Sequence, residues 1–502
     1  MITAIKLKEN KNTLDLRLGE YYTAFHKEGV LHLNKNIKVK TSQSLKDLTV
    51  YPVRVAKIIP PDTIMVDVIS DTYKVKEDTE EKKGSDTELT GMIMKKAETK
   101  RKEFTWKHPV LAKMQAQFIT VATIIRMAIY TKTPIIIRHH ADCDGYASAI
   151  NLERAILPLL AKEYGDYTYK YFSRNPSKTP FYDYTDALRD IEYALNNKRK
   201  YGNKLPLIIL TDLGGGEENK ITVSMARSLG AKIIIIDHHD PGPITNEKST
   251  MCNISDAHLN PFLFGSDSRF PAGTLTYELA YFINEDFTGL PLAPAIAAVA
   301  DRAERYEQDI FAHYTGLAKG YEVDYLIKLT RIIDYQALAA KFLDISSIMD
   351  ILYGENEEKQ RELVELLYPE IDRVSEEFKE AIKRYSEVKE FPTFRLVMID
   401  SEACSFRGEY PSPGKLVGLT QDHFKEEGKG QVTIGKLPGM LIFRCDGVAG
   451  FDVNTIIAKT MKELPFALAE GGGHAAAGSM AFIQAARQDV LNLVMDYLSS
   501  LG

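Results

Sequence analysis

Aspartate and histidine residues follow three apolar runs of this sequence. Residues 135–137 lead into the segment RHHADCDG (138–145), residues 207–210 lead into Thr211 and Asp212, and residues 233–236 lead into the segment DHHD (237–240). Hard divalent cations prefer carboxylate oxygens, and imidazole joins them when manganese is the ion. The predicted metal ligands are therefore His140, Asp142, Asp144, Asp212, His238 and, after the apolar segment 296–300, Asp301.

Four or more carboxylates on one edge of a sheet repel one another unless positive charge lies between them. Two cations about 3.5 to 4 Å apart can activate a water molecule and neutralise the charge that develops on a phosphate. This chemistry predicts hydrolysis of phosphodiester bonds. A simpler alternative is that each Asp or His only caps the helix after its strand. Capping explains one such residue, but it requires neither an H-x-D-x-D-G pattern nor consecutive histidines.

These residues must be held by a parallel sheet. The β-branched runs at 135–137, 207–210 and 233–236 alternate with helical segments, which is typical of a sheet covered on both faces. In such a sheet ligands bind at the carboxyl ends of the strands, where the Asp and His residues lie. We therefore predict an α/β catalytic domain over residues 109–322, with an amphipathic helix that begins at Pro109.

Three further regions surround this domain. Residues 1 to about 75 alternate in short strand-like runs, which predicts an N-terminal β-barrel domain of the oligonucleotide-binding (OB) type over residues 1–100. Its interleaved Tyr21, Tyr22, Phe25, His26 and Lys27 would suit single-strand binding, although aromatic residues of a small core would give the same pattern. Residues 323–390 are rich in helix formers and predict a helical connector. Residues 391–502 predict a smaller α/β domain with strands at 394–399 and 440–443, a glycine-rich turn at 471–473 and a terminal helix.

Composition narrows the class of protein. The chain has 502 residues, with 44% hydrophobic and 26% charged, which excludes a disordered or fibrous protein. No run of 18 apolar residues and no signal-peptide pattern is present, so we expect a cytoplasmic protein without membrane contact. The four cysteines form no C-x-x-C pair, which suggests neither structural zinc nor disulfides. The net charge of −6 means that a nucleic acid would have to be bound by a local basic groove or by metal ions.

The motifs resemble those of the DHH/DHHA1 phosphoesterase superfamily. The shared pattern is His140-x-Asp142-x-Asp144-Gly145, Asp212, Asp237-His238-His239 and Asp301, followed by the segment GGGHAAAG at 471–478. Within the superfamily, their order is most similar to that of RecJ-type single-strand-specific exonucleases, especially the archaeal RecJ-like proteins. The resemblance covers residues 109–502. It implies a parallel-sheet DHH domain, a smaller DHHA1 domain and two divalent cations, with Mn²⁺ preferred and Mg²⁺ possible.

The resemblance also implies a role for each matching residue. His140, Asp142 and Asp212 would hold one ion, and Asp144, Asp212, His238 and Asp301 the other. His239 would contact the scissile phosphate, while Asp237 orients a ligating imidazole through a hydrogen bond. Gly472, Gly473, His474 and Arg444 would bind substrate, although Phe443 and Cys445 stand beside Arg444 where the family often has serines. His139 receives no role.

Three functions stay open at this point. The first is an exonuclease acting on single-stranded DNA or RNA in repair, replication or RNA turnover, and the β-rich residues 1–100 favour such a polymer. The second is a phosphodiesterase of short oligonucleotides or cyclic dinucleotides. The third is a non-catalytic replisome scaffold, which the complete ligand set disfavours. A replication, repair or RNA-processing protein is a possible partner.

Overall fold

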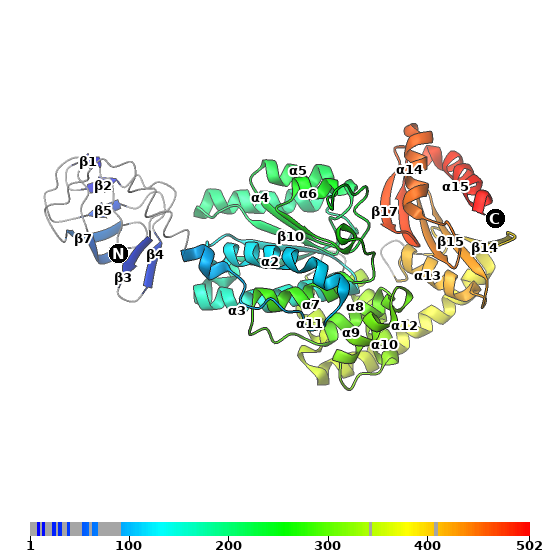
Figure 1. The fold of residues 1–502 in the computed structure, drawn as a ribbon, viewed down its shortest axis with the longest axis horizontal. Helices are drawn as coiled ribbons and strands as arrows, with labels where there is room; N and C mark the ends of the chain where they lie inside the picture. Colours follow the sequence, from blue (N-terminus) through cyan, green and yellow to red (C-terminus); the bar gives the residue numbers. More distant parts are fainter. Residues whose placement is uncertain are drawn as a thin grey trace. The chain divides into compact units, whose positions relative to one another are not determined.

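The computed structural model describes residues 92–340, 344–405 and 410–501 with their side chains and, within residues 1–91, the backbone of the strands. The chain divides into two compact units. One comprises residues 1–96 with 193–204, and the other comprises residues 97–192 with 205–502 (Figure 1).

The N-terminal unit contains a five-stranded sheet in the order β1-β2-β5-β7-β6 and a separate hairpin of β3 and β4. The strands are β1 (Lys8–Asn10), β2 (Thr13–Asp15), β3 (Thr23–His26), β4 (Gly29–His32), β5 (Lys38–Lys40), β6 (Val53–Ile59) and β7 (Thr63–Val68). The predicted β-rich character is therefore found in the backbone, whereas closure into an OB-like barrel stays a prediction. The side chains of Tyr21, Tyr22, Phe25, His26 and Lys27 lie outside the described residues.

The second unit is built on a five-stranded parallel sheet in the order β12-β11-β10-β8-β9. Its strands are β8 (Ile135–His140), β9 (Phe172–Ser177), β10 (Leu207–Thr211), β11 (Lys232–Ile236) and β12 (Ala257–Leu259). The chain runs from β8 outward to β9 and then returns to β10 on the other side of β8. The strand order therefore reverses between β8 and β10, and ligands of open α/β sheets bind at such a point.

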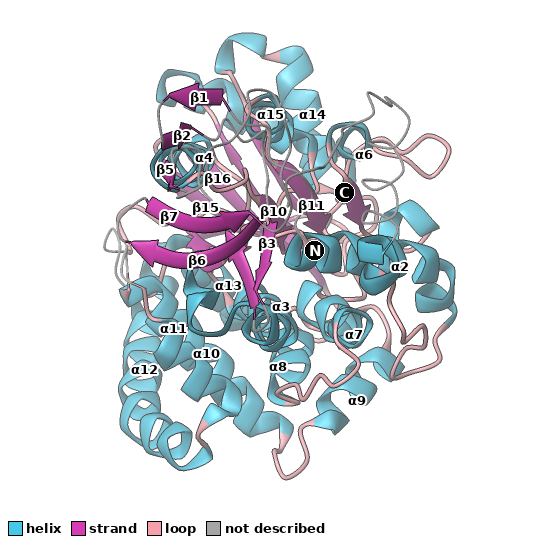
Figure 2. Cartoon of the chain, turned by 90° about the vertical axis from the view of Figure 1, so that its left-hand side faces the viewer, coloured by secondary structure: helices cyan, strands magenta, loops and turns pink. Residues whose placement is uncertain are grey.

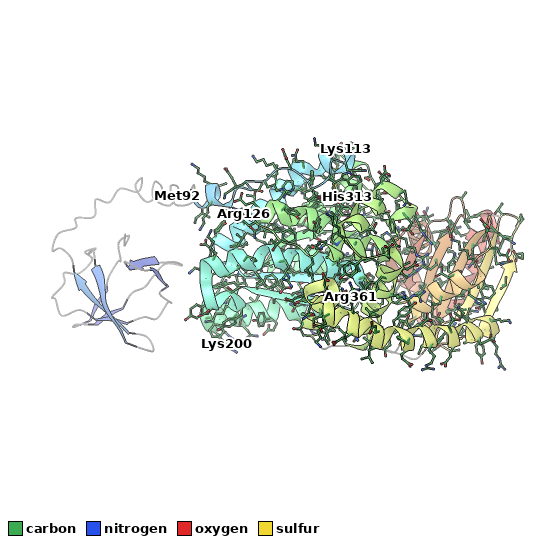
Figure 3. All side chains as sticks on the ribbon, turned by 90° about the horizontal axis from the view of Figure 1, so that it is seen from below. Met92, Lys113, Arg126, Lys200, His313 and Arg361 are labelled. Carbon is green, nitrogen blue, oxygen red and sulfur yellow. The ribbon has the colours of Figure 1, made fainter. Side chains whose placement is uncertain are left out.

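Helices cover both faces of this sheet, because alternate strand residues point to opposite sides and nearly all of them are apolar. Ile135, Ile137, Leu207 and Ile209 pack in one core with α2 (Pro109–Tyr130), α3 (Cys143–Tyr164) and α7 (Ala272–Ile283). The opposite face lies toward α4 (Tyr184–Tyr201), α5 (Lys220–Ser228) and the short α6 (Thr250–Ile254) (Figure 1). Arg126 ties α2 to its surroundings by donating to the carbonyl of Ile283 at 2.6 Å (Figure 3).

Along the chain, the parallel sheet is followed by a layer of helices (Figure 2). It consists of α8 (Leu292–Ala300), α9 (Gln308–Leu317), α10 (Val323–Ala339), α11 (Ser346–Asp350) and α12 (Glu357–Tyr385). Pro369 lies inside α12, and the helix continues through it. Val364 and Ile371, on the two sides of Pro369, are both buried in the same apolar core, which stabilises the uninterrupted helix. Within the described residues no helix is both long and apolar enough to cross a membrane.

The predicted connector was wrong for its last five residues. Ser386–Glu390 forms strand β13, which pairs antiparallel with β14 (Phe394–Asp400) instead of extending α12. This strand is the edge of a six-stranded mixed sheet in the order β13-β14-β15-β16-β18-β17. The other strands are β15 (Gly430–Leu437), β16 (Met440–Asp446), β17 (Glu470–His474) and β18 (Ala477–Ala481), and the helices are α13 (Pro413–Phe424), α14 (Val453–Glu463) and α15 (Arg487–Leu501).

The glycine-rich segment is not the turn that the sequence predicted. Gly471, Gly472 and Gly473 lie within β17, which pairs with β18. Gly471 and Gly473 have φ angles of 155° and 139°, and a Cβ atom on them would lie 2.1 Å from the carbonyl oxygen of Ser479 and 2.5 Å from that of Ala477. The two glycines are therefore required by close approach to the neighbouring strand.

A buried ion pair holds β8 to α4. The Arg138 guanidinium donates through Nε to Asp190 at 3.1 Å, and both side chains are almost fully buried. We predict that Asp190→Ala lowers the free energy of unfolding by about 3 kcal/mol, the low end of the range for a broken buried pair, because the buried guanidinium keeps only the weaker carboxylate contact to Asp186 at 3.3 Å. Denaturant titration measures the change. Glu362→Ala, which breaks an exposed pair with Lys359, is the control and should cost at most about 1 kcal/mol. Equal losses in the two variants would contradict this account of β8.

Candidate metal centre

The candidate ligands meet at the carboxyl edge of the parallel sheet, at the point where the strand order reverses. His140 ends β8, Asp212 directly follows β10, and His238 lies two residues after β11. Asp142 is the N-cap of α3, and its Oδ1 accepts from the Gly145 amide at 2.9 Å. A Cβ atom at Gly145 would lie 2.1 Å from the His140 carbonyl oxygen, so the glycine permits this tight turn. Capping and metal binding are thus compatible at Asp142.

Asp212 occupies the centre of the site. Its φ angle of 57° is unusual for a residue other than glycine, and such strained residues concentrate at functional sites. Its two carboxylate oxygens face different neighbours: Oδ2 lies 3.7 Å from Nδ1 of His140, and Oδ1 lies 3.5 Å from Nε2 of His238. This side chain can therefore contact two ions at once.

The first ligand group contains His140, Asp142 and Asp212, whose candidate ligand atoms lie within 4.8 Å of one another. Nδ1 of His140 is 2.7 Å from Oδ2 of Asp142. Burial alone would lower the pKa of His140, but Asp142 and Asp212 outweigh it and hold the pKa well above its usual value. The strong negative potential that has this effect would equally attract a cation.

The second ligand group contains Asp144, Asp212 and His238, again within 4.8 Å of one another. The Asp301 carboxylate joins it, with Oδ2 3.1 Å from Nε2 of His238. Asp144 also accepts hydrogen bonds at 2.7 Å from the amides of Ala272 and Gly273, at the start of α7. Burial, followed by the charges of Asp212 and Asp301, raises the pKa of Asp144 well above its usual value. The two amides at the start of α7 therefore offset only part of the repulsion between the carboxylates of Asp144, Asp212 and Asp301.

The donor set fits a pair of divalent cations. Among the described residues, the buried Oδ2 of Asp212 has no hydrogen-bond partner, and unsatisfied buried polar atoms are costly without a ligand. Nε2 of His238 faces carboxylate oxygens at 3.1 to 3.5 Å, which a cation between them would also contact. The two groups share Asp212, and mixed carboxylate and imidazole ligands suit Mn²⁺ and, less closely, Mg²⁺. The structure thus brings all six predicted metal ligands together, while their assignment to individual ions stays a prediction.

Asp237 contacts a different imidazole from the one expected. Its Oδ1 lies 2.7 Å from Nδ1 of His239, not from the ring of the metal-ligand candidate His238. Its Oδ2 accepts from the Gly215 amide at 2.7 Å, and a Cβ atom at Gly215 would lie 2.6 Å from this oxygen. Asp237 therefore orients His239, and the loop after β10 holds Asp237.

The two adjacent histidines do not point in opposite directions. Such alternation holds along an extended strand, but β11 ends at Ile236, before the pair. The rings of His238 and His239 face the same space, with centroids 4.8 Å apart and planes at 65°. Separate roles for the two histidines therefore have to be argued from their contacts.

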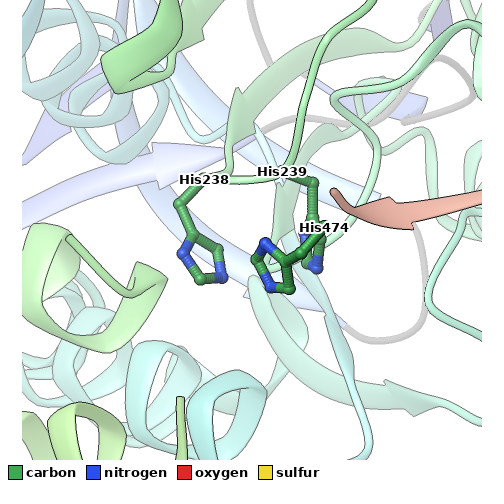
Figure 4. Close-up of side chains that lie close together, drawn as sticks. All are labelled: His238, His239 and His474. Atoms are coloured by element: carbon green, nitrogen blue, oxygen red, sulfur yellow. The ribbon is translucent and has the colours of Figure 1, made fainter. Parts of the chain in front are cut away.

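The C-terminal domain adds His474 to this space (Figure 4). Its ring stacks on His239 with centroids 4.6 Å apart, and its Nδ1 lies 2.9 Å from Oγ of Ser268. Burial lowers the pKa of His474 well below its usual value, and the charges of His239 and His238 add to the effect. Gly472 lies close to the carboxylate of Glu218, whose atoms would be 3.9 Å from a Cβ atom at this glycine.

Arg444 lies within β16 and donates from Nη1 to the carbonyl of Phe443 at 2.8 Å. Burial, together with the charges of the neighbouring Arg302 and Arg305, lowers the pKa of Arg444 to about 10. A group of like charges of this kind attracts an anion. The prediction that Arg444 binds a phosphate is compatible with these surroundings.

Sequence reasoning missed several polar residues around the centre. They are Glu218, Asn260, Ser268, Arg302 and Arg305, and they lie in loops and short 3₁₀ turns between the predicted elements. Asn260 donates to the carbonyl of His239 at 2.9 Å, and Arg302 has a φ angle of 52° directly after Asp301. Of these residues, only Arg302 and Arg305 could have been identified from the sequence, because they closely follow the candidate metal ligand Asp301.

Fold and site together define a protein with two α/β domains in its second unit and a carboxylate–histidine centre for divalent cations. Residues 134–300 match the model of the DHH family, N-terminal domain. A solved structure titled as the DHH domain of a member of the s1p family of ribosomal proteins is 33% identical, with a TM-score of 0.78, and the match covers 84% of this chain and 99% of that one. The chain therefore belongs to the DHH family.

Two other similarities extend this comparison. The protein named Uncharacterized protein MJ1198 of Methanocaldococcus jannaschii is 32% identical over 424 residues, which is 79% of this chain but 56% of that protein's length. RecJ of Thermus thermophilus, solved in complex with Mn²⁺, is 14% identical, with a TM-score of 0.50 over 80% of this chain and 56% of that one. The latter similarity shows a common RecJ-like fold.

We predict that wild-type protein binds two Mn²⁺ ions in a calorimetric titration and that Asp212→Ala weakens the binding of both, because its carboxylate faces both ligand groups. Asp240→Ala is the matched control. Asp240 belongs to the same DHHD segment, but its carboxylate accepts from the Gly242 amide and lies outside the ligand groups. Two ions bound by Asp212→Ala with unchanged affinity would refute the bridging position.

Proposed function

We propose that this protein is a metal-dependent exonuclease that hydrolyses phosphodiester bonds of single-stranded nucleic acid by a two-metal mechanism. The observation that carries the proposal is Asp212, whose two carboxylate oxygens face two separate ligand groups. A pair of divalent ions held by these groups supplies Lewis acidity and an activated water. Mn²⁺ is the preferred ion in this proposal, supported by the imidazoles of His140 and His238 and by the Mn²⁺ complex of the structurally similar RecJ.

The protein's own side chains supply orientation and proton transfer. His239 takes the position next to the scissile phosphate, and its Nδ1 contact with Asp237 directs Nε2 toward the substrate. An imidazole in this position can give a proton to the leaving oxygen. His474, stacked on His239, limits the space on the other side of the phosphate. Arg444 binds a phosphate farther along the strand, since Arg302 and Arg305 increase the positive potential around it.

A polymeric substrate is favoured over a small one by the additional β-rich N-terminal unit, which a dinucleotide would not need. RNA and DNA are proposed as substrates on equal terms, because the relative at 33% identity is titled as a member of a ribosomal protein family. A replication, repair or RNA-processing protein is the partner class that this substrate suggests.

The test is digestion of single-stranded DNA and RNA of about 20 nucleotides, a length that exceeds the 4 to 16 nucleotides of one OB-fold site. Each substrate is labelled at one end and then at the other, with Mn²⁺ present or removed by a chelator. We expect stepwise shortening from one end that depends on the metal. Cleavage of di- or trinucleotides alone would support the short-oligonucleotide phosphodiesterase. The absence of hydrolysis from a protein that holds two ions would favour the non-catalytic scaffold.

A second prediction concerns the division between metal binding and proton transfer. His239→Ala should retain two Mn²⁺ ions, whereas its turnover should fall by about 10²- to 10⁴-fold, the usual range for a lost general acid. Calorimetry and single-turnover kinetics on the same sample separate the two effects. Loss of one ion from this variant would mean that His239 is a metal ligand.

A third prediction concerns the N-terminal unit. Deletion of residues 1–96 should weaken binding to a strand of about 20 nucleotides by a few kcal/mol, since each stacked base contributes about 1 to 3 kcal/mol. Cleavage of a trinucleotide should persist, because all the candidate metal ligands belong to residues 97–502. Unchanged strand affinity together with an altered molar mass would instead identify the deleted segment as a protein-binding or dimerisation element.

A further inference from the structure

We propose that Ser268 is a positioning residue that fixes the orientation of His238 and His474 together, and so links the C-terminal domain to the alignment of the metal centre. The catalytic part of this inference rests on the proposed function, whereas the hydrogen bonds themselves do not. Ser268 precedes α7 and is only 5% exposed to solvent.

Ser268 first orients His238. The backbone carbonyl oxygen of Ser268 lies 3.3 Å from Nδ1 of His238. A carbonyl oxygen can only accept, so the ring carries a proton on Nδ1 and presents the lone pair of Nε2. Nε2 is the atom that lies 3.1 Å from Asp301 and 3.5 Å from Asp144. A metal-ligating histidine usually has such an acceptor on its other nitrogen.

The Ser268 hydroxyl then orients His474. It donates its single proton to the backbone carbonyl of His238 at 2.8 Å. Toward Nδ1 of His474, 2.9 Å away, the same oxygen must therefore accept. The neutral ring of His474 thus carries its proton on Nδ1 and directs the lone pair of Nε2 toward the space shared with His239 (Figure 4).

The loop around Ser268 is held firmly enough for this task. On one side, the Asp267 carboxylate accepts from Nε of Arg269 at 2.8 Å, and on the other, Nη1 of Arg269 donates to Glu307 at 2.7 Å. The hydroxyl therefore has little freedom to turn away from its two histidines.

The contact joins two domains. Ser268 and His474 are 206 residues apart, and His474 belongs to β17 of the C-terminal sheet. Without this contact, the imidazole of His474 would be free to exchange its proton between the two nitrogens. One side chain thus links the position of β17 to the residues that surround the reacting phosphate.

The test uses the full chain with Mg²⁺ and ¹⁵N-labelled histidine, and His474→Gln identifies the signal of His474. We expect the wild-type ring to be protonated on Nδ1 and Ser268→Ala to lose this preference. Ser266→Ala is the matched control, because the Ser266 hydroxyl, in the same loop, has no hydrogen-bond partner among the described residues. A wild-type His474 protonated on Nε2 would overturn the proposal, whether or not the protein hydrolyses nucleic acid.

Kinetics tests the catalytic part. Ser268→Ala should still bind two ions, because it keeps the carbonyl that orients His238, but its kcat should fall by about 10- to 100-fold, the usual effect of losing such a supporting contact. Ser268→Thr, which restores a hydroxyl, should recover most of the loss. The double variant Ser268→Ala/His474→Ala should be no slower than His474→Ala. Additive losses in the double variant would show that Ser268 does not act through His474.

Discussion

Mutual repulsion between carboxylates at one edge of the parallel sheet is the constraint on which the rest of the site depends. Asp144 and Asp212 are almost fully buried, and Asp301 reaches the same imidazole. Two like charges about 4 Å apart cost about 4 kcal/mol at an effective dielectric constant of 20, so the folded chain can hold this cluster only with compensating positive charge. Divalent cations provide that compensation, and the structure offers them two ligand groups that share one carboxylate.

Each surrounding element compensates part of the repulsion between these carboxylates. The start of α7 donates two amides to Asp144, the loop after β10 donates the Gly215 amide to Asp237, and His239 pairs with Asp237. The apolar interior of the sheet keeps the strand ends in register, so the ligands cannot relax away from one another. The C-terminal domain then closes over the free side of the cluster with imidazole and guanidinium groups, which suit a phosphate.

The sequence predicted the part of this arrangement that depends on periodicity. Buried β-branched runs identify β8, β10 and β11, and parallel strands bring their carboxyl ends to one edge, so the meeting of His140, Asp212 and His238 followed directly. Loop residues such as Ser268 and Asn260 could not be predicted, because their positions depend on tertiary contacts. The glycines of β17 were misjudged for the same reason: what they approach is the backbone of β18, which no local pattern reveals.

The most direct test of the two-metal centre is the anomalous scattering of Mn²⁺ in crystals of the full chain. The account predicts two peaks about 3.5 to 4 Å apart, with Asp212 in contact with both, His140 and Asp142 beside one, and His238, Asp144 and Asp301 beside the other. A single peak, or two peaks without Asp212 between them, would contradict it.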